Sequence, residues 1–187
     1  SAVRCWSRLW GTGGGGEKPE SGMRMGTGIA GTGKSADVGE SVERLRKDGK
    51  VVDIISKTHA ASRRAGGVTA DHWVRRHVIH GAPKCDVLWV DEISQLDVGL
   101  WLQINKLAST PMQFLLSCDF NQFSPIGNTF RGATVSESAF ESSGLLHTLG
   151  GGNQVVLTTC RRSEAVLFDF YSSLIAGGSR FELRVAD

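Results

Sequence analysis

The segment from Gly28 to Ser35 constrains this chain more than any other, and it contains Gly-Ile-Ala-Gly-Thr-Gly-Lys-Ser. It matches the phosphate-binding loop pattern G-x-x-x-x-G-K-[ST] at every fixed position. Glycine backbones reach conformations closed to other residues, so consecutive N–H groups can point at phosphate oxygens. A chance turn in a chain with 24 glycines does not explain a Lys and a Ser at these offsets. We predict a phosphate site at Gly28, Ala30, Gly31, Thr32, Gly33, Lys34 and Ser35.

The size and charge of the chain limit the remaining possibilities. A length of 187 residues suits one domain with one core, and a net charge of +2 argues neither for nor against nucleic acid. The four cysteines show no metal-ligand or disulfide spacing, which indicates reduced thiols inside a cell. There is no apolar run near 18 residues and no signal peptide, so we expect neither membrane insertion nor secretion.

Strand and helix patterns alternate along the chain. Apolar residues at Val38, Val42 and Leu45, with charges between them, indicate an amphipathic helix. We predict helices at residues 36–47, from His59 to Gly66, at 96–107, 139–145 and 165–175, and strands at 23–25, 51–55, 86–90, 113–117 and 155–157. This alternation predicts an α/β fold with a mainly parallel sheet. Residues 1–22 are glycine-rich, and we expect them to be disordered or non-native, with one domain over 23–187.

Asp91 and Glu92 follow the predicted strand at 86–90 directly, as in a Walker B motif. Paired acids are usually only solvated, but the apolar strand before them and the phosphate loop upstream favour function. At the carboxyl end of a parallel strand beside the loop strand, Asp91 can hold Mg²⁺ and Glu92 can orient or deprotonate the attacking water. Ser35 supplies a hydroxyl for the same ion.

In this order, the motifs resemble the first RecA-like domain of superfamily 1B helicases, the RecD-like and Pif-type group. The loop ending A-G-T-G-K-S is typical of that group, and Asp91-Glu92-Ile93-Ser94 is similar to its D-E-I-S motif. The segment from Cys118 to Gln122 is similar to its G-D-x-x-Q motif, with Cys118 in place of Gly. The resemblance covers about residues 28–178 and implies a three-layer P-loop NTPase (RecA-like) fold.

The resemblance also implies roles for residues outside the loop. Gln122 would sense the γ-phosphate and orient water, and Arg162 would contact the γ-phosphate, with Arg161 as the alternative register. Four residues would contact single-stranded nucleic acid, with one of the two rings stacking on a base: Thr58, Thr69, His72 and Trp73. Caps or core-edge positions are the alternative for these four. The basic pairs Arg63-Arg64 and Arg75-Arg76 are either phosphate contacts or solvated helix faces.

The function that these motifs predict is an ATP-binding motor domain of an ATP-dependent DNA helicase. Its cofactors would be ATP and Mg²⁺, and its partner single-stranded DNA, with RNA possible as in viral superfamily 1 helicases. The chain starts at Ser1 and stops at Asp187, so we expect a fragment that lacks the second RecA-like domain. Two alternatives stay open: a nucleotide-gated binding module without helicase activity, and a small-molecule kinase with the same loop.

Overall fold

The structure is a computed structural model that describes residues 24–28, 34–119, 128–130, 132–135, 144–149 and 154–157. The strands are β1 (Arg24–Gly28), β2 (Val52–Ser56), β3 (Val68–Thr69), β4 (Val87–Asp91), β5 (Gln113–Ser117), β6 (Thr129–Phe130), β7 (Ala133–Thr134) and β8 (Gln154–Leu157). The α-helices are α2 (Lys34–Lys47), α3 (His59–Ala65), α4 (Ala70–Val74), α5 (Val98–Asn105) and α7 (Gly144–Leu149). A π-helical turn at Arg75–Ile79 continues α4, and 3-10 turns at Ile93–Gln95 and Lys106–Ser109 flank α5.

Six strands form one sheet in the order β3-β2-β4-β5-β1-β8, and every pairing within it is parallel. The prediction of a mainly parallel sheet is therefore confirmed. The expectation that the Walker B strand lies beside the loop strand is wrong, because β5 lies between β4 and β1. Since β5 is an apolar run buried on both faces, it suits the centre of the sheet.

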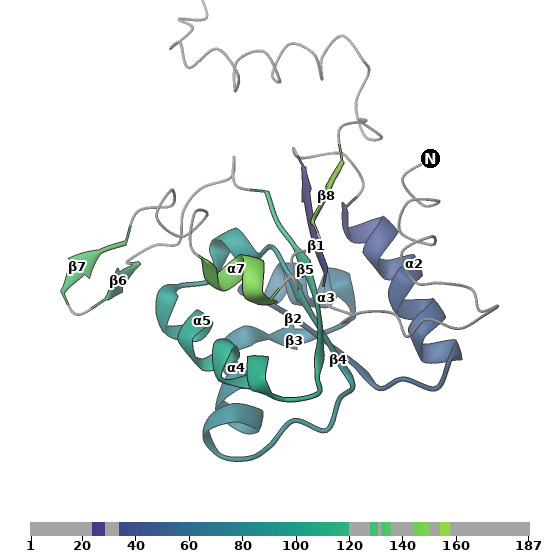
Figure 1. The fold of residues 1–187 in the computed structure, drawn as a ribbon, viewed down its shortest axis with the longest axis horizontal. Coiled ribbons are helices and arrows are strands. Elements are labelled where there is room, and N and C mark those ends of the chain that lie inside the picture. Colours follow the sequence, from purple (N-terminus) through teal and green to yellow (C-terminus); the bar gives the residue numbers. More distant parts are fainter. Residues whose placement is uncertain are drawn as a thin grey trace, which may run out of the picture.

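Helices cover both faces of the sheet and make three layers (Figure 1). On one face, Val38, Val42 and Leu45 of α2 pack in a cluster with Val52, Ile54, Val87, Trp89 and Leu115. On the other face, α4, α5 and α7 pack against Leu88, Val90, Phe114 and Leu116. Because successive strand residues face opposite sides, β4 is buried on both and is apolar throughout until Asp91.

Local capping explains where the helices begin and end. Thr58 Oγ1 accepts a hydrogen bond from Ala61 N at 3.1 Å and starts α3, and Gly66 ends α3 in the left-handed conformation. A Cβ at Gly67 would lie 2.1 Å from the Ile54 carbonyl oxygen, so only glycine lets the chain pass β2 here. The helix that was predicted at 96–107 begins only at Val98 in the structure. Asp97 Oδ1 accepts a hydrogen bond from Leu100 N at 3.0 Å and caps α5 there.

The other differences concern short or non-local elements. β1 runs to Gly28 and pairs with both β5 and β8, although the sequence before the loop is poor in apolar residues. β3 was not predicted, nor was the antiparallel pair β6 and β7, since two-residue strands show no alternation. Residues 1–22 and the predicted helix at 165–175 lie outside the described residues. Among the helices described, none is long and apolar enough to span a membrane.

Candidate nucleotide site at the carboxyl edge of the sheet

The phosphate-loop segment connects β1 to α2. β1 ends at Gly28 and α2 begins at Lys34, with Ser35 as its second residue. Ala30, Gly31, Thr32 and Gly33 lie outside the described residues, as do the side chains of Lys34 and Ser35. Because β1 ends at the carboxyl edge of the sheet, the N-terminal end of this 14-residue helix lies at that edge too. A helix N-terminus carries positive partial charge and unpaired N–H groups, which suits phosphate.

Asp91 lies at the carboxyl end of β4 and is 2% exposed. Ser117, the last residue of β5, donates a hydrogen bond from Oγ to Asp91 Oδ1 at 2.6 Å. The same hydroxyl accepts a hydrogen bond from Trp89 Nε1 at 2.9 Å. Trp89 packs in the cluster under α2, and Asp91, two residues further along β4, faces the same side. Asp91 therefore shares both an edge and a face of the sheet with the start of α2.

Ser117 is a site residue that the sequence interpretation missed. It donates to a nearly buried carboxylate, and buried charges need such partners. The signal available in the sequence was a lone hydroxyl at the end of an otherwise apolar strand, Gln-Phe-Leu-Leu-Ser. Its partner is 26 residues away in the chain, so no local pattern connects the two.

Glu92 adopts a left-handed backbone conformation, with φ 52° and ψ 50°. Among the described residues it is the one non-glycine position with positive φ. Such backbone strain costs on the order of 1–3 kcal/mol and concentrates at functional sites. Its Oε1 pairs with Arg64 Nη2 of α3 at 2.8 Å, and the two side chains are 22% and 61% exposed. Arg64 was predicted only as a member of a basic pair, not as a partner of Glu92.

A buried hydrogen bond also joins the turns that follow β4 and β5. Ser94 Oγ donates to the backbone carbonyl of Asp119 at 3.0 Å, and both residues are buried. This contact connects the two segments that resemble helicase motifs, Asp91 to Ser94 and Cys118 to Gln122. Gln122 and Arg162 themselves lie outside the described residues, so their roles stay predictions.

Lys57 ties three elements together beside the site. It follows β2 directly and pairs with Asp97 at 2.8 Å and Asp71 at 3.1 Å. Partial burial acts to lower the pKa of Lys57, but hydrogen bonds and attraction from the two carboxylates outweigh it, so the net pKa is raised. Burial likewise acts to raise the pKa of Asp97, but hydrogen bonds from Lys57 and Leu100 N outweigh it and lower the pKa. The end of β2 is thus held by charge to the starts of α4 and α5.

Three of the predicted nucleic-acid contacts lie at or near this edge. Thr69 pairs in register with Ser56 at the end of β2, and Thr58 follows two residues later in the chain. Thr58 and His72 are exposed and Thr69 is partly exposed. Thr58 also caps α3, so the structure shows the capping role that was the alternative for this residue.

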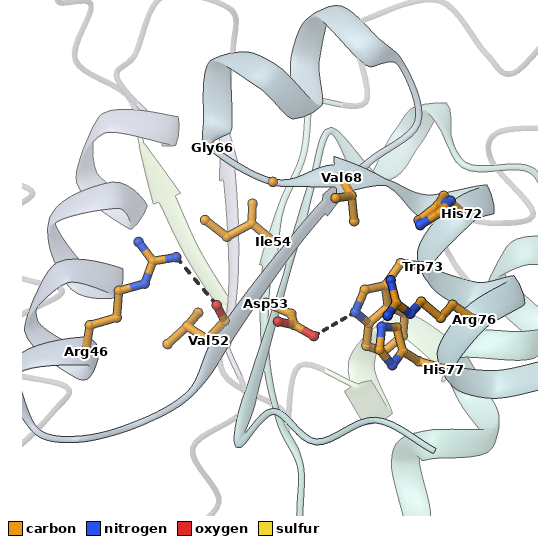
Figure 2. A pocket seen from close by; sticks show the side chains of 11 residues that line it. Arg46, Val52, Asp53, Ile54, Gly66, Val68, His72, Trp73, Arg76 and His77 are labelled. Atoms are coloured by element: carbon orange, nitrogen blue, oxygen red, sulfur yellow. Dashed lines mark hydrogen bonds between the residues drawn. The ribbon is translucent and has the colours of Figure 1, made fainter. Parts of the chain in front are cut away.

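The predicted stacking role of Trp73 is wrong. Its side chain is 2% exposed, and it packs in the core with residues of α4, α5, β4 and β5. Its Nε1 donates to Asp53 Oδ2 at 2.7 Å, toward the start of β2 rather than the carboxyl edge (Figure 2). Trp73 follows Ala70 by one helical turn, and both face the core, because residues three apart share a helix face. A buried ring offers no face to a base.

A cavity of about 330 Å³ lies beside the part of β2 that β3 does not cover (Figure 2). Arg46, His72, Arg76 and His77 contribute basic groups to its lining. The carboxylate in it, Asp53, accepts the hydrogen bond from Trp73 Nε1. Burial raises the pKa of Cys85 to about 12, and the charge and hydrogen bond of Asp53 act in the same direction. Apart from His72, the residues that line this cavity are not those of the carboxyl-edge site.

The sheet order and the carboxyl-edge residues define a class, the P-loop NTPase domain with an additional strand between the loop strand and the Walker B strand. The chain belongs to the AAA domain family, whose match covers residues 18–147. No curated protein sequence matches the chain.

Several solved structures share this fold. The Pif1 helicase from Candida albicans matches with a TM-score of 0.63 and 21% identity, over 92% of this chain and 42% of that chain. Bacteroides Pif1 bound to ssDNA matches with a TM-score of 0.58 and 16% identity, over 83% of this chain and 43% of that chain. Bacteroides sp Pif1 in complex with ADP-AlF4 matches with a TM-score of 0.59 and 17% identity, over 92% of this chain and 45% of that chain. The predicted Pif-type, RecA-like fold is confirmed, and the chain spans less than half the length of these helicases.

Proposed function

We propose that this chain is the ATP-binding motor domain of an ATP-dependent helicase, which couples Mg·ATP hydrolysis to movement on single-stranded nucleic acid. The observation that carries the proposal is the position of Asp91. It lies at the same edge and on the same face of the sheet as the start of α2, which bears Lys34 and Ser35. This arrangement would bring phosphates held at the loop close to the acidic pair.

Nucleotide would bind at the loop between β1 and α2. Backbone N–H groups of residues 28–33 and the N-terminal end of α2 would face the phosphates, and Lys34 would neutralise part of their charge. The Pif1 structure in complex with ADP-AlF4 supports a nucleotide as the ligand of a domain with this fold.

The residues present fit a magnesium ion. Mg²⁺ prefers oxygen ligands and few of them from protein, and Asp91 and Ser35 offer a carboxylate and a hydroxyl. The nearly buried Asp91 carboxylate is already oriented by Ser117. The ion would neutralise charge that develops on the phosphate oxygens.

Glu92 would act as the residue that positions the attacking water and accepts its proton. Its carboxylate is partly exposed at the carboxyl edge, one residue after Asp91. Gln122 and Arg162 would contact the γ-phosphate, as the resemblance implies. General-base catalysis of this kind contributes about 10²- to 10⁴-fold to a rate.

Single-stranded DNA would run along the edge that carries Thr58 and Thr69, with His72 nearby. The Pif1 structure bound to ssDNA supports this class of partner. RNA is the alternative polymer, and competition between DNA and RNA oligonucleotides of the same sequence distinguishes them.

Nucleotide binding by Lys34→Ala tests the proposal. Calorimetry with Mg·ATP should show binding by the wild-type chain and none by this variant. Lys50→Ala, which changes an exposed lysine after α2, is the matched control and should bind as wild type. Unchanged affinity in Lys34→Ala would contradict the loop assignment.

A further inference from the structure

The Arg64–Glu92 ion pair connects the proposed water-activating residue to a helix outside the nucleotide site. Arg64 Nη2 lies 2.8 Å from Glu92 Oε1, so one carboxylate oxygen is already engaged by a cation. A general base must present a lone pair to its water, with heavy atoms about 2.6–3.2 Å apart. In this arrangement Oε1 is turned toward α3.

Both members of this pair lie in or beside regular secondary structure, so we expect the side chains to move when the pair opens. α3 is capped at both ends, by Thr58 and by Gly66. Glu92 is followed by a 3-10 turn in which Ile93 and Ser94 are buried. Arg64 is the more accessible partner, because its side chain is 61% exposed and the Glu92 side chain is 22% exposed.

A phosphodiester is a strong competitor for Arg64. The planar guanidinium donates two parallel hydrogen bonds to phosphate, whereas here one nitrogen meets one carboxylate oxygen. Exposed ion pairs are weak because solvent screens them. Thr58, a residue predicted to face nucleic acid, caps the N-terminal end of α3.

We propose that Arg64 restrains Glu92 while nucleic acid is absent, and that a phosphate of the bound single strand takes Arg64 and releases Glu92. Arg64 is then a positioning residue that makes ATP hydrolysis depend on the polymer. This inference rests on the proposed function, since it uses Glu92 as the base and nucleic acid as the partner.

The side-chain carboxyl carbon of Glu92 gives a direct test by NMR in the 187-residue chain, with oligo(dT) as the probe. In wild type this signal should shift when the oligonucleotide binds. In Arg64→Ala it should start near the shifted position and respond little. Arg63→Ala removes the same charge from the same helix but keeps the ion pair, so its Glu92 signal should start and move as in wild type. Arg64→Lys, which keeps the charge, should restore part of the restraint.

Hydrolysis gives a second readout in the whole gene product. In the absence of oligonucleotide, Arg64→Ala should hydrolyse ATP several-fold faster than wild type. The ratio of its rates with and without oligo(dT) should be close to one. Arg44→Ala, an exposed arginine late in α2, should leave both quantities as in wild type. A lower basal rate in Arg64→Ala would mean that Arg64 orients Glu92 for catalysis, which overturns the restraint.

The outcomes separate this inference from the proposed function. If oligo(dT) binds but the wild-type Glu92 signal does not move, the inference fails and the helicase proposal stands. If Lys34→Ala retains full nucleotide affinity, or oligo(dT) does not bind at all, the proposed function fails and takes this inference with it.

Discussion

Ser117 Oγ lies 2.6 Å from Asp91 Oδ1 and joins the ends of two neighbouring strands, β5 and β4. Asp91 is 2% exposed, so hydrogen-bond donors of the protein must replace part of the water that its carboxylate has lost. Trp89 Nε1 donates to the same Ser117 oxygen. One hydroxyl therefore orients the proposed magnesium ligand and satisfies a buried indole.

Ser117→Ala should lower both the stability and the affinity for Mg·ATP. Removing the hydroxyl deprives a buried carboxylate oxygen and a buried indole N–H of a partner, which costs about 1–3 kcal/mol per group. Urea unfolding measures the stability and calorimetry the affinity. Ser109→Ala changes an exposed serine and should stay within about 0.5 kcal/mol of wild type. Equal midpoints for the two variants would show that the Ser117 contact contributes nothing.

Glu92→Gln should separate binding from hydrolysis. The amide cannot accept the proton of the attacking water, while Asp91 and Ser117 are unchanged, so nucleotide should bind as in wild type. The rate of phosphate release by the whole gene product should fall by about 10²- to 10⁴-fold. Glu43→Gln, which changes an exposed glutamate of α2, is the matched control. Turnover by Glu92→Gln at the wild-type rate would remove Glu92 from the mechanism.

The central strands were predictable because they are buried on both faces. Such strands are continuous apolar runs, and β5 has the predicted bounds while β4 is displaced by one residue. Strand order was not predictable, since β1 is placed by its pairings with β5 and β8 rather than by its own composition.

The site was predictable only where residues are adjacent in sequence. The loop and the Asp91-Glu92 pair are local motifs, so their placement at one edge follows from a parallel sheet. Ser117 and Arg64 lie 26 and 28 residues from their acidic partners, and no local pattern indicates either contact. Trp73 was misassigned because an aromatic beside an exposed histidine suits both a base platform and a helix core.

Trp73→Ala should lower stability strongly. Truncating a buried tryptophan costs about 3–5 kcal/mol, and Asp53 also loses the indole donor. Leu102→Ala, at a residue 42% exposed, should cost far less in the same urea titration. Trp73→Phe keeps most of the ring volume, so the chain should stay folded and bind oligo(dT) with unchanged affinity. A loss of that affinity in folded Trp73→Phe would restore the stacking role.

Asp97→Asn should reduce the acid sensitivity of the fold. The pKa of Asp97 is lowered below 3.8 in the folded chain, because the bonds from Lys57 and Leu100 N outweigh partial burial. Near pH 3.8 the unfolded chain therefore binds more protons at this group than the folded chain does. The stabilisation from Asp97 is complete above that pH and is lost as the pH falls toward the folded pKa.

The size of this effect is small, because the Asp97 side chain is 33% exposed and solvent screens the pair, so we expect about 0.2–1 kcal/mol. Asn is as good an N-cap as Asp, so the substitution removes the charge while an acceptor for Leu100 N remains. Urea midpoints measured from pH 7 down to pH 3 should differ between wild type and Asp97→Asn at neutral pH and converge at the acid end. Asp48→Asn changes an exposed aspartate after α2 and is the matched control. A constant offset between wild type and Asp97→Asn over the whole range would show that the ion pair with Lys57 does not couple folding to pH.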